Sequence, residues 1–459
     1  MNAETAASPP SPPTPLTVAL VLPAEPPGTN NFHQVPIGSL YTAGRLRDRG
    51  MAVAFHDLRL NRPEGPEGAE TYREIAAADL VVVFSADYDL AQCYPSLGPT
   101  VECVRLLRAA GARRIACAGS HATADPELTR RHTGCDTVVV GEFEFAVPDL
   151  AAELAARLAA REPAPERWPL TGSRLADEDE LAALGPPAYD LAPMRRYFSE
   201  GFVDGQLDRV NSGLVLANRG CPFGCDFCYL FFGRRLRRRP VAATLAELRT
   251  LREEYGIRHF FFLDYTFTVD NEWAAALSDG ILELGLDISW ICQTRVDCLD
   301  DATLARMRRA GCAGIWLGVE SPDIEQRRYL GKGRIGFEDI QRAVELIRSH
   351  DINVLAFVMV GLPNETEASL ASLNSWLSES RVYYSLSTFQ RRLGTPLAAE
   401  RGIDVTPENG WGYLDHRTDH LGESELRRAD LGAFFAFHDT SPTRVANVMR
   451  RRLAERAPS

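Results

Sequence analysis

The chain has 459 residues, 45% of them apolar and 24% charged, and it carries a formal net charge of −12 at pH 7. This length and apolar content predict a globular protein with two or three domains. The negative charge opposes generic binding to phosphate backbones, so nucleic acid is not an expected partner. No apolar run has the length needed to span a bilayer, so we expect no membrane partner either.

The N-terminal segment, residues 1–15, is rich in proline and small polar residues and lacks the charged and apolar regions of a signal peptide. We therefore predict a disordered leader on a cytoplasmic protein. The chain also has 10 cysteines without the dense spacing of a disulfide framework, which indicates free thiols in a reducing compartment.

Short β-branched runs alternate with helical patterns in the first third of the chain, which predicts a parallel sheet covered by helices. The stretches GSLYTAGRLRDRG and VECVRLLRAAG supply two of these helices. We therefore expect a doubly wound, Rossmann-like α/β domain over residues 16–150. Its expected strands are residues 16–22, 51–57, 79–86, 113–120 and 136–142.

Residues 151–210 are rich in proline and alanine and lose this rhythm, so we interpret them as a linker. A second alternating series predicts a partial, TIM-like (β/α)6 barrel over residues 211–390. Residues 391–459 have helical character and are expected to form a small, mostly helical C-terminal region. The expected barrel strands are residues 213–218, 258–264, 287–295, 313–320, 352–360 and 383–388.

The stretch NRGCPFGCDFCYLFFG, residues 218–233, places Cys221, Cys225 and Cys228 in a C-x3-C-x2-C pattern on a loop after a predicted strand. Cysteine thiolates are the usual ligands of iron–sulfur clusters. On a cubane with four irons, three thiolates leave one iron open for a substrate or cofactor. The alternatives are a zinc site completed by a distant residue such as Cys292 or His259, or three structural thiols.

The motif CPFGCDFC, with Phe227 before the third cysteine, resembles the signature of the radical S-adenosylmethionine (SAM) enzymes. The resemblance implies that the three cysteines hold a [4Fe-4S] cluster whose open iron binds the amino and carboxylate groups of SAM. It further implies that one-electron reduction cleaves SAM to a 5′-deoxyadenosyl radical. An external electron donor such as flavodoxin or ferredoxin is then an expected partner.

Four later segments, FFFLDYTFT, CQTRVD, LGVES and VGLPNET, resemble strand ends of the same family, although Tyr265 stands where its first motif has a second acid. Active sites of β/α barrels gather at the C-terminal ends of strands, which agrees with this placement. Taken singly, Glu320 could be a solvated strand end and Arg295 a member of a surface ion pair. The resemblance places at SAM the residues Asp264, Gln293, Arg295, Glu320 and Ser321, with Gly361 and Pro363 in the turn facing its adenine.

A doubly wound domain binds its ligand outside the carboxyl ends of its strands. In the first domain these ends carry Asp57, Ser85 and the loop AGSHATADPE, residues 118–127. A nucleotide-binding fold is the general alternative. However, no G-x-G-x-x-G motif follows the first strand, which argues against a dinucleotide site.

The segments VPIGSLYTAGRLRDRG, AGSHATADPE and DTVVVGEFE resemble the cobalamin-binding module that precedes the radical domain in cobalamin-dependent radical SAM enzymes. Two departures from its G-G-P-H-A-T loop occur, because Ala118 replaces the first glycine and Ser120 the proline. We expect the methyl group of Ala118 to crowd the corrin or its nucleotide tail. By resemblance, Gly119, Ser120 and His121 contact cobalamin, His121 as a hydrogen-bonding partner and not as a cobalt ligand.

The D-x-H-x-x-G signature of other cobalamin proteins is absent, because Arg59 occupies the histidine position after Asp57. If cobalamin binds here, we expect its own base to be displaced, with no histidine on the lower face of cobalt. Weak axial ligation favours a cobalt that is readily reduced and remethylated, as a methyl carrier requires.

The run GRRLRRRP, residues 233–240, has two interpretations, a grip for phosphates or an anionic substrate and a solvated helix entry with ordinary ion pairs. The cysteines outside the motif are expected to be small buried thiols. These are Cys93, Cys103, Cys117, Cys135, Cys292, Cys298 and Cys312.

The family resemblance covers residues 16–390 and predicts a cobalamin-dependent radical SAM methyltransferase. Such an enzyme moves a methyl group from SAM, through methylcobalamin, to an unactivated carbon of a small-molecule substrate. Cyclisation, rearrangement or oxidation with the same cofactors is one alternative, and a non-catalytic cofactor-binding sensor is another. We expect the substrate pocket to include the barrel mouth and the segment NGWGYLDHRTDH, residues 409–420.

Overall fold

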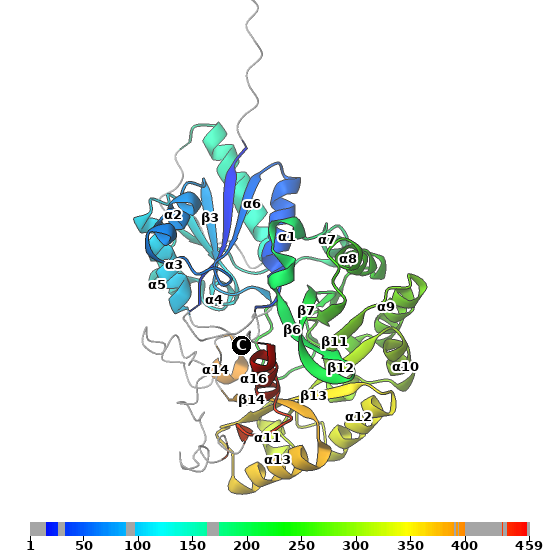
Figure 1. Cartoon of the computed structure of the whole chain (residues 1–459). Coiled ribbons are helices and arrows are strands. Elements are labelled where there is room, and N and C mark those ends of the chain that lie inside the picture. The colour runs from blue at the N-terminus through cyan, green and yellow to red at the C-terminus, as the bar shows by residue number, and fades with distance from the viewer. Residues whose placement is uncertain are drawn as a thin grey trace, which may run out of the picture.

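A computed structural model describes residues 15–25, 33–88, 97–162, 174–389, 392, 394–399, 434 and 438–456. Two α/β units make up most of the molecule, one built on a five-stranded sheet and the other on a seven-stranded curved sheet (Figure 1). The predictions of a disordered leader, of a buried Cys93 and of a pocket role for residues 409–420 fall on positions outside the described residues.

The N-terminal unit, which we call the N-terminal domain, has a parallel sheet in the order β2-β1-β3-β4-β5. Alternate residues of its strands face opposite sides, since Leu20 belongs to the core under α1 and α6 and Val21 to the core under α2 and α3. The predicted doubly wound fold is therefore confirmed. The strands are β1 (Thr17–Leu22), β2 (Ala52–Asp57), β3 (Leu80–Phe84), β4 (Ile115–Ala118) and β5 (Thr137–Val138).

Helices cover both faces of this sheet, and α6 is long enough to continue past residue 150. The helices are α1 (Ile37–Asp48), α2 (Gly65–Ala76), α3 (Gly98–Ala109), α4 (Ser120–Ala124), α5 (Pro126–Thr133) and α6 (Phe143–Ala159). The segment leading to the second unit contains α7 (Glu178–Ala182) and two 3-10 turns, Tyr189–Leu191 and Met194–Arg196.

The second unit, which we call the barrel domain, has a sheet in the order β14-β13-β12-β11-β10-β7-β6. Six of these strands are parallel, as the predicted partial (β/α)6 barrel requires, and β6 is antiparallel to β7. The strands are β6 (Phe198–Val203), β7 (Gln206–Val215), β10 (His259–Phe262), β11 (Ser289–Thr294), β12 (Cys312–Glu320), β13 (Asn353–Val360) and β14 (Tyr383–Thr388).

The helices of the barrel domain follow the outer side of the curved sheet (Figure 1). They are α8 (Val241–Glu253), α9 (Asn271–Glu283), α10 (Asp301–Arg309), α11 (Ile324–Tyr329), α12 (Phe337–Ser349) and α13 (Glu367–Ser380). Two 3-10 turns, Phe267–Val269 and Val296–Cys298, follow β10 and β11. A two-stranded ribbon of β8 (Asn218–Arg219) and β9 (Arg237–Arg238) is inserted between β7 and α8.

The strand β6 is an addition to the sheet that the alternating pattern did not predict. It forms a hairpin with β7 through Asp204 and Gly205, which both have positive φ angles, 49° and 73°. An Asp-Gly pair between two extended runs is a known hairpin signal, because a two-residue turn of this kind matches the twist of the strands. The signal lay inside the proline- and alanine-rich segment that we interpreted as a linker.

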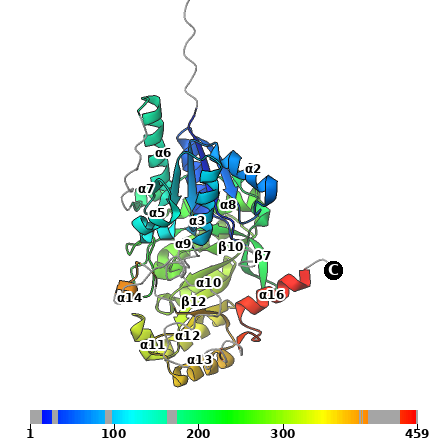
Figure 2. The same ribbon diagram turned by 90° about the vertical axis from the view of Figure 1, so that its left-hand side faces the viewer.

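The C-terminal part of the described chain contains α14 (Pro396–Ala399) and α16 (Val445–Arg456). The helix α16 packs against both β7 and β14, which are separated from each other by four other strands of the sheet (Figures 1 and 2). It therefore bridges the two sides of the incomplete barrel. Within the described ranges, no helix is both long enough and apolar enough to cross a bilayer.

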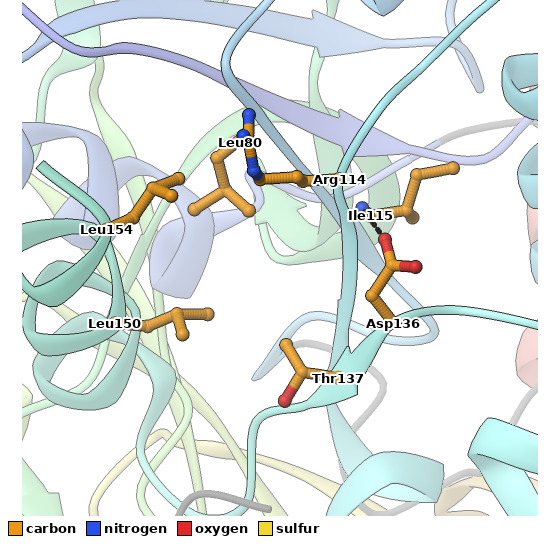
Figure 3. A pocket seen from close by; sticks show the side chains of 7 residues that line it. All are labelled: Leu80, Arg114, Ile115, Asp136, Thr137, Leu150 and Leu154. Atoms are coloured by element: carbon orange, nitrogen blue, oxygen red, sulfur yellow. Dashed lines mark hydrogen bonds between the residues drawn. The ribbon is translucent and has the colours of Figure 1, made fainter. Parts of the chain in front are cut away.

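A small cavity of about 10 Å³ lies at the beginnings of β3, β4 and β5, between the sheet and α6 (Figure 3). Its wall is largely apolar and includes Leu80, Ile115 and Leu150. A space of this size holds at most a single water molecule, and it lies at the opposite end of the strands from the expected ligand crevice. It is therefore a packing defect and not a ligand site.

Candidate functional site

The three motif cysteines lie on one loop, which we call the cluster loop, residues 220–236, between β8 and β9. The loop closes on itself, since the amide of Cys221 donates to the carbonyl oxygen of Gly233 at 3.1 Å. Gly220 has a φ of 85°, and a Cβ at this position would collide with the carbonyl oxygen of Arg235. The start of the loop therefore requires glycine.

The thiols are mostly withdrawn from solvent, with Cys221 8% and Cys225 7% exposed and Cys228 half-buried. Burial raises the pKa of the Cys225 thiol, against the opposing effect of Lys332 and Arg295, and raises that of Cys228 to about 12. Free thiols at Cys225 and Cys228 are therefore protonated at neutral pH. A bound cation must therefore stabilise the thiolate forms, as metal binding does.

Among the described residues, no three His, Cys, Asp or Glu side chains are close enough to hold one metal ion. The three thiols of a cubane bind three different irons, so they need not converge on one point as zinc ligands do. Three cysteines on one closed loop are thus a donor set suited to a cluster. The cysteines that would hold it are Cys221, Cys225 and Cys228.

Arg295, at the end of β11, contacts the cluster loop directly. Its Nη1 donates to the Sγ of Cys225 at 3.1 Å, and its guanidinium lies 3.9 Å from the centroid of the Phe223 ring. Asp297 fixes the other side of the guanidinium through a bidentate pair at 2.8 and 2.9 Å. Arg295 is therefore a cation held against a cluster-ligand position, and also a member of an ion pair.

Glu320, at the end of β12, has a φ of 63° at an irregularity in the pairing of β12 with β13. Its carboxylate accepts from the Nζ of Lys332 at 2.6 Å, and both side chains are buried. Lys332 lies 5.6 Å from the centroid of the Phe227 ring, so it connects Glu320 with the cluster loop. Lys332 was not predicted, because it lies on a short loop after α11 with no recognisable motif.

Asp264 follows β10 and is buried beneath the entrance to the cluster loop. Its carboxylate accepts from the backbone amides of Ala217, at 3.4 Å, and of Asn218. Burial raises the pKa of Asp264 to about 7, although these two hydrogen bonds oppose the rise. Gln293 donates to the carbonyl oxygen of Leu263 at 3.4 Å, beside the same carboxylate. Asp264 thus supports the backbone that leads to the cysteines, and Gln293 supports the residue before Asp264.

The turn after β13 also reaches the cluster loop. Gly361 has a φ of 82°, and its amide donates to Glu365 at 2.7 Å. Leu362 belongs to a small apolar cluster against which Phe227 packs, and Pro363 follows it half-buried. Glu365 was not predicted, and its position in the same GLPNET segment was the available signal.

The structure therefore brings several predicted residues of the barrel domain to one loop. Arg295 contacts Cys225, Glu320 reaches Phe227 through Lys332, and Leu362 of the Gly361 turn belongs to the apolar cluster against which Phe227 packs. The remaining residue, Ser321, accepts from the amide of Asp323 at 3.0 Å, at the start of α11. These contacts come from the ends of three parallel strands, as in an active site of a β/α barrel.

In the N-terminal domain, Ser85 and the loop after β4 lie together. The hydroxyl of Ser85 donates to the carbonyl oxygen of Ala118 at 3.0 Å. Gly119 has a φ of 111°, and a Cβ there would be 2.5 Å from the carbonyl oxygen of Ala86, so only glycine fits. The buried Ser120 hydroxyl makes no hydrogen bond with any described residue, and the imidazole of His121 is buried beside it. A ligand that supplies polar atoms here would satisfy Ser120, which fits the tail of cobalamin.

The crowding expected from Ala118 does not appear at the crevice. Its side chain is fully buried in the domain core that also contains Phe84 and Phe143. The methyl group of Ala118 therefore does not project into the space at the carboxyl end of the sheet, where a ligand is expected to bind.

Asp57 and Arg59 form a separate group at the end of β2. The two side chains are paired at 2.8 Å and nearly fully buried, and Tyr197 donates to Asp57 at 3.0 Å. Burial acts to raise the pKa of Asp57, but Arg59 outweighs it and holds the pKa below its ordinary value. Because β1 lies between β2 and β3, this pair does not join the group around Ser85 and Gly119.

A further carboxylate, which the sequence analysis missed, fixes the first helix at the same edge of the sheet. Asp87, after β3, accepts from the amides of Gly38 at 2.8 Å and Ser39 at 2.7 Å, and from the Ser39 hydroxyl. It satisfies the first free amides of α1 in the way a capping residue does. Asp87 was difficult to predict as a capping residue, because it is distant in sequence from the helix α1 that it caps.

Two arginines of the run at residues 233–240 fit neither of the interpretations from the sequence, a grip for an anion or a solvated helix entry. Arg237 and Arg239 are buried, and Arg239 contacts the hydroxyl of Tyr41 in the N-terminal domain at 2.7 Å and Glu247 on α8 of the barrel domain at 2.6 Å. Arg238, between them, is exposed and makes ordinary ion pairs with Asp270 and Glu178. Alternation along β9 and the residue that follows it separates the buried arginines from the exposed one.

Most thiols outside the motif are buried, as expected, and Cys298 is half-buried. The buried ones are Cys103, Cys117, Cys135, Cys292 and Cys312.

Comparisons with known proteins agree with this geometry. Residues 215–377 match the family described as the Radical SAM superfamily. An uncharacterized methyltransferase, PH0819, of Pyrococcus horikoshii is 31% identical over 298 residues, which span 62% of this chain and 61% of that protein. The anaerobic magnesium-protoporphyrin IX monomethyl ester cyclase of Rubrivivax gelatinosus is 30% identical over 166 residues, 35% of this chain and 30% of that protein. This chain thus spans less than two thirds of the length of either relative.

The fold is also shared with a solved structure. The radical SAM methyltransferase TsrM from Kitasatospora setae, solved with cobalamin and a [4Fe-4S] cluster, superposes with a TM-score of 0.65 at 18% identity. The superposition covers 85% of this chain and 75% of TsrM. The radical SAM resemblance inferred from the motifs is confirmed over residues 215–377, and the chain shares its two-domain fold with TsrM.

Proposed function

We propose that this chain is a cobalamin-dependent radical SAM methyltransferase that transfers a methyl group to a carbon atom of a small-molecule substrate. The observation that carries the proposal is the closed three-cysteine loop at the strand ends of the barrel, with Arg295 donating to Cys225 at 3.1 Å. The fold shared with TsrM and the methyltransferase among the relatives support it.

In this proposal, the N-terminal domain, which extends to the end of α6 at residue 159, binds cobalamin, and the barrel domain, which begins with β6 at residue 198, binds cluster and SAM. The segment between them links the two domains. Residues 391–459 then complete the substrate side. When bound, the cluster with SAM supplies a radical that activates the substrate, and cobalamin supplies the methyl group. An external donor such as flavodoxin or ferredoxin provides the electron.

The chain's own residues orient these groups. Cys221, Cys225 and Cys228 hold the cluster, and Arg295 lowers the cost of negative charge at Cys225. Glu320, held by Lys332, presents an acceptor beside the loop for an ammonium or hydroxyl group of SAM. Ser120 presents the unsatisfied hydroxyl that a cobalamin tail would meet.

The proposal is tested by anaerobic reconstitution of the full chain with iron, sulfide and hydroxocobalamin. We expect about four irons and one cobalt per chain, and formation of 5′-deoxyadenosine from SAM after reduction. Cys225→Ala should lose the cluster and the cleavage of SAM, whereas Cys298→Ala, a half-buried thiol outside the motif, should keep both. Retained cleavage in Cys225→Ala would overturn the assignment of the cluster ligands.

A second function, ring formation with the same cofactors, is favoured by the cyclase among the relatives. SAM with a deuterated methyl group separates the two functions once a substrate turns over. Label in the product supports methyl transfer, and an unlabelled, cyclised or oxidised product supports the alternative.

A further inference from the structure

Four charged side chains are buried together where the two domains meet. Glu142 and Glu144 come from the N-terminal domain, and Arg219 and Arg237 come from the β8–β9 ribbon. Arg219 lies 2.5 Å from Glu144 and 3.3 Å from Glu142, and Arg237 lies 2.8 Å from Glu142. We call these four residues the interdomain clamp.

The clamp is both dry and balanced in charge. The side chains of Arg219, Glu142 and Glu144 are 0% exposed, and that of Arg237 is 3% exposed. Two carboxylates face two guanidinium groups, so no net charge is buried. Neutral donors also contact the carboxylates, because the hydroxyl of Tyr88 donates to Glu144 and the amide of Ala176 donates to Glu142 at 2.6 Å.

The two arginines lie at the two ends of the cluster loop. Arg219 and Arg237 are directly opposite each other across the ribbon, one immediately before the loop and the other immediately after it. Both ends of the loop that carries the three cysteines are therefore paired with carboxylates of the N-terminal domain, and Glu142 is paired with both arginines. Gly220, with its required positive φ, is the one residue between Arg219 and Cys221.

The two carboxylates lie at the edge of the N-terminal domain where a ligand is expected to bind. Glu142 and Glu144 lie at the start of α6, directly after the carboxyl end of the sheet, where a doubly wound domain binds its ligand. Aromatic contacts continue across the same junction. Tyr88 stacks on Phe143 with centroids 4.4 Å apart, and it meets Phe231 at 5.5 Å and Phe232 at 4.8 Å on the cluster loop.

Buried ion pairs of this kind are a poor way to gain stability, since apolar residues of similar volume often do as well. What they add is a fixed pairing, because a buried guanidinium that moves away from its carboxylate leaves both charges unpaired in the interior, which is strongly unfavourable. A clamp at both ends of one loop restricts how that loop sits against the neighbouring domain.

We propose that Glu142, Glu144, Arg219 and Arg237 are positioning residues that set the placement of the cluster relative to cobalamin. The part of this inference that concerns the cluster and cobalamin rests on the proposed function. The structural part, that the N-terminal domain orders the cluster loop through these ion pairs, applies to the chain without cofactors.

The structural part is tested by hydrogen–deuterium exchange of the full chain without cofactors. Glu144→Gln is expected to raise amide exchange in peptides covering residues 218–240 by about tenfold, although the substitution lies in the other domain. Arg219→Met is expected to raise exchange around residues 137–150 in return. Arg238→Met is the control, because this arginine lies on the same strand but is exposed, and it should leave both regions unchanged.

The placement is tested in the reconstituted protein by electron paramagnetic resonance. The reduced cluster and cob(II)alamin are both paramagnetic, and their spin–spin interaction falls steeply with distance. We expect Glu144→Gln and Arg219→Met to change or broaden this interaction, and Arg238→Met to preserve it. The double variant Glu144→Gln/Arg219→Met keeps the Glu142–Arg237 pair and a balanced charge. It should regain thermal stability over the single variants while its spin–spin interaction stays altered.

Two results would overturn the inference: exchange that rises only in the substituted domain, or a spin–spin interaction that matches the wild type in folded variants. A double variant that recovers both its stability and its spin–spin interaction would show that the clamp serves stability alone. Failure of the proposed function is distinguishable, because a wild-type protein that binds no cluster or no cobalamin still yields the exchange result.

Discussion

At the scale of single residues, most charged groups of the candidate site already have a partner. Arg59 is paired with Asp57, Arg295 with Asp297 and Lys332 with Glu320. Such pairs fix the direction of a side chain before a ligand arrives, which reduces the ordering that binding requires. The buried hydroxyl of Ser120, without a partner among the described residues, is a contrasting case.

Asp264 leads to a prediction on pH. Its pKa is raised by burial to about 7 in the folded chain, above its ordinary value of 3.8. Between these values the folded chain holds a proton that the unfolded chain has released, so stability falls as pH rises. We expect the free energy of unfolding contributed by this group to drop by about 2 kcal/mol between pH 5 and pH 7.

The measurement is denaturant unfolding of the chain without cofactors at pH 5, 6 and 7, for the wild type and for Asp264→Asn. The wild type should lose more stability over this range than the variant, whose amide does not titrate. Glu365, whose pKa burial also raises to about 7, is present in both proteins and cancels in the difference. Equal pH dependence in the two proteins would contradict the prediction.

At the scale of elements, the short β8–β9 ribbon positions both the cluster loop and the arginines that face the N-terminal domain. Each strand has 2 residues, yet together they hold the cluster loop and present Arg219 and Arg237 to the other domain. A ribbon this short is not stable alone. It is stabilised by what surrounds it, including the hydrogen bonds from Ala217 and Asn218 to Asp264.

The ribbon yields a prediction on two glycines of one loop. Gly220→Ala should destabilise the chain by roughly 2 kcal/mol and reduce iron incorporation, because of the positive φ and the collision with the carbonyl oxygen of Arg235. Gly224→Ala is the matched control, since no atom lies within 4 Å of a Cβ at that position. Thermal unfolding and iron content after reconstitution decide the outcome, and similar losses in both variants would refute this account.

At the scale of the whole molecule, the C-terminal helix and the interdomain clamp connect parts that are distant in sequence. The helix α16 bridges β7 and β14, and His438 precedes it. The imidazole of His438 lies 2.6 Å from the hydroxyl of Tyr384 on β14 and 2.6 Å from Asn374 on α13. Burial lowers the pKa of His438 to about 4, so the ring is neutral at pH 7 and can donate at one nitrogen and accept at the other.

We therefore predict that His438→Leu loosens the C-terminal helix from the barrel. The loss of two buried hydrogen bonds should raise the rate of trypsin cleavage at arginines within residues 444–456 by roughly tenfold. His350→Leu, which removes a surface hydrogen bond with Asp301, should have little effect. Cleavage at the same rate in His438→Leu and the wild type would show that these hydrogen bonds do not retain the helix.

The sequence by itself determined the features that depend on neighbours along the chain. The β-branched runs predicted all five strands of the first sheet and the six parallel strands of the second, because strand periodicity is local. The cysteine spacing likewise predicted one loop that carries three thiols, and the structure places all three on the loop between β8 and β9. The strand β6 was missed although its Asp204–Gly205 signal was local, since it was masked by the composition around it.

Only the tertiary structure decided which distant residues meet. Arg237 and Glu142 are 95 positions apart, and Lys332 reaches the cluster loop from a loop without a motif. An arginine in a run looks the same in the sequence whether its side chain faces water, a phosphate or a buried carboxylate. Its partner depends on how two domains pack, and that packing is set by contacts that no short stretch of sequence contains.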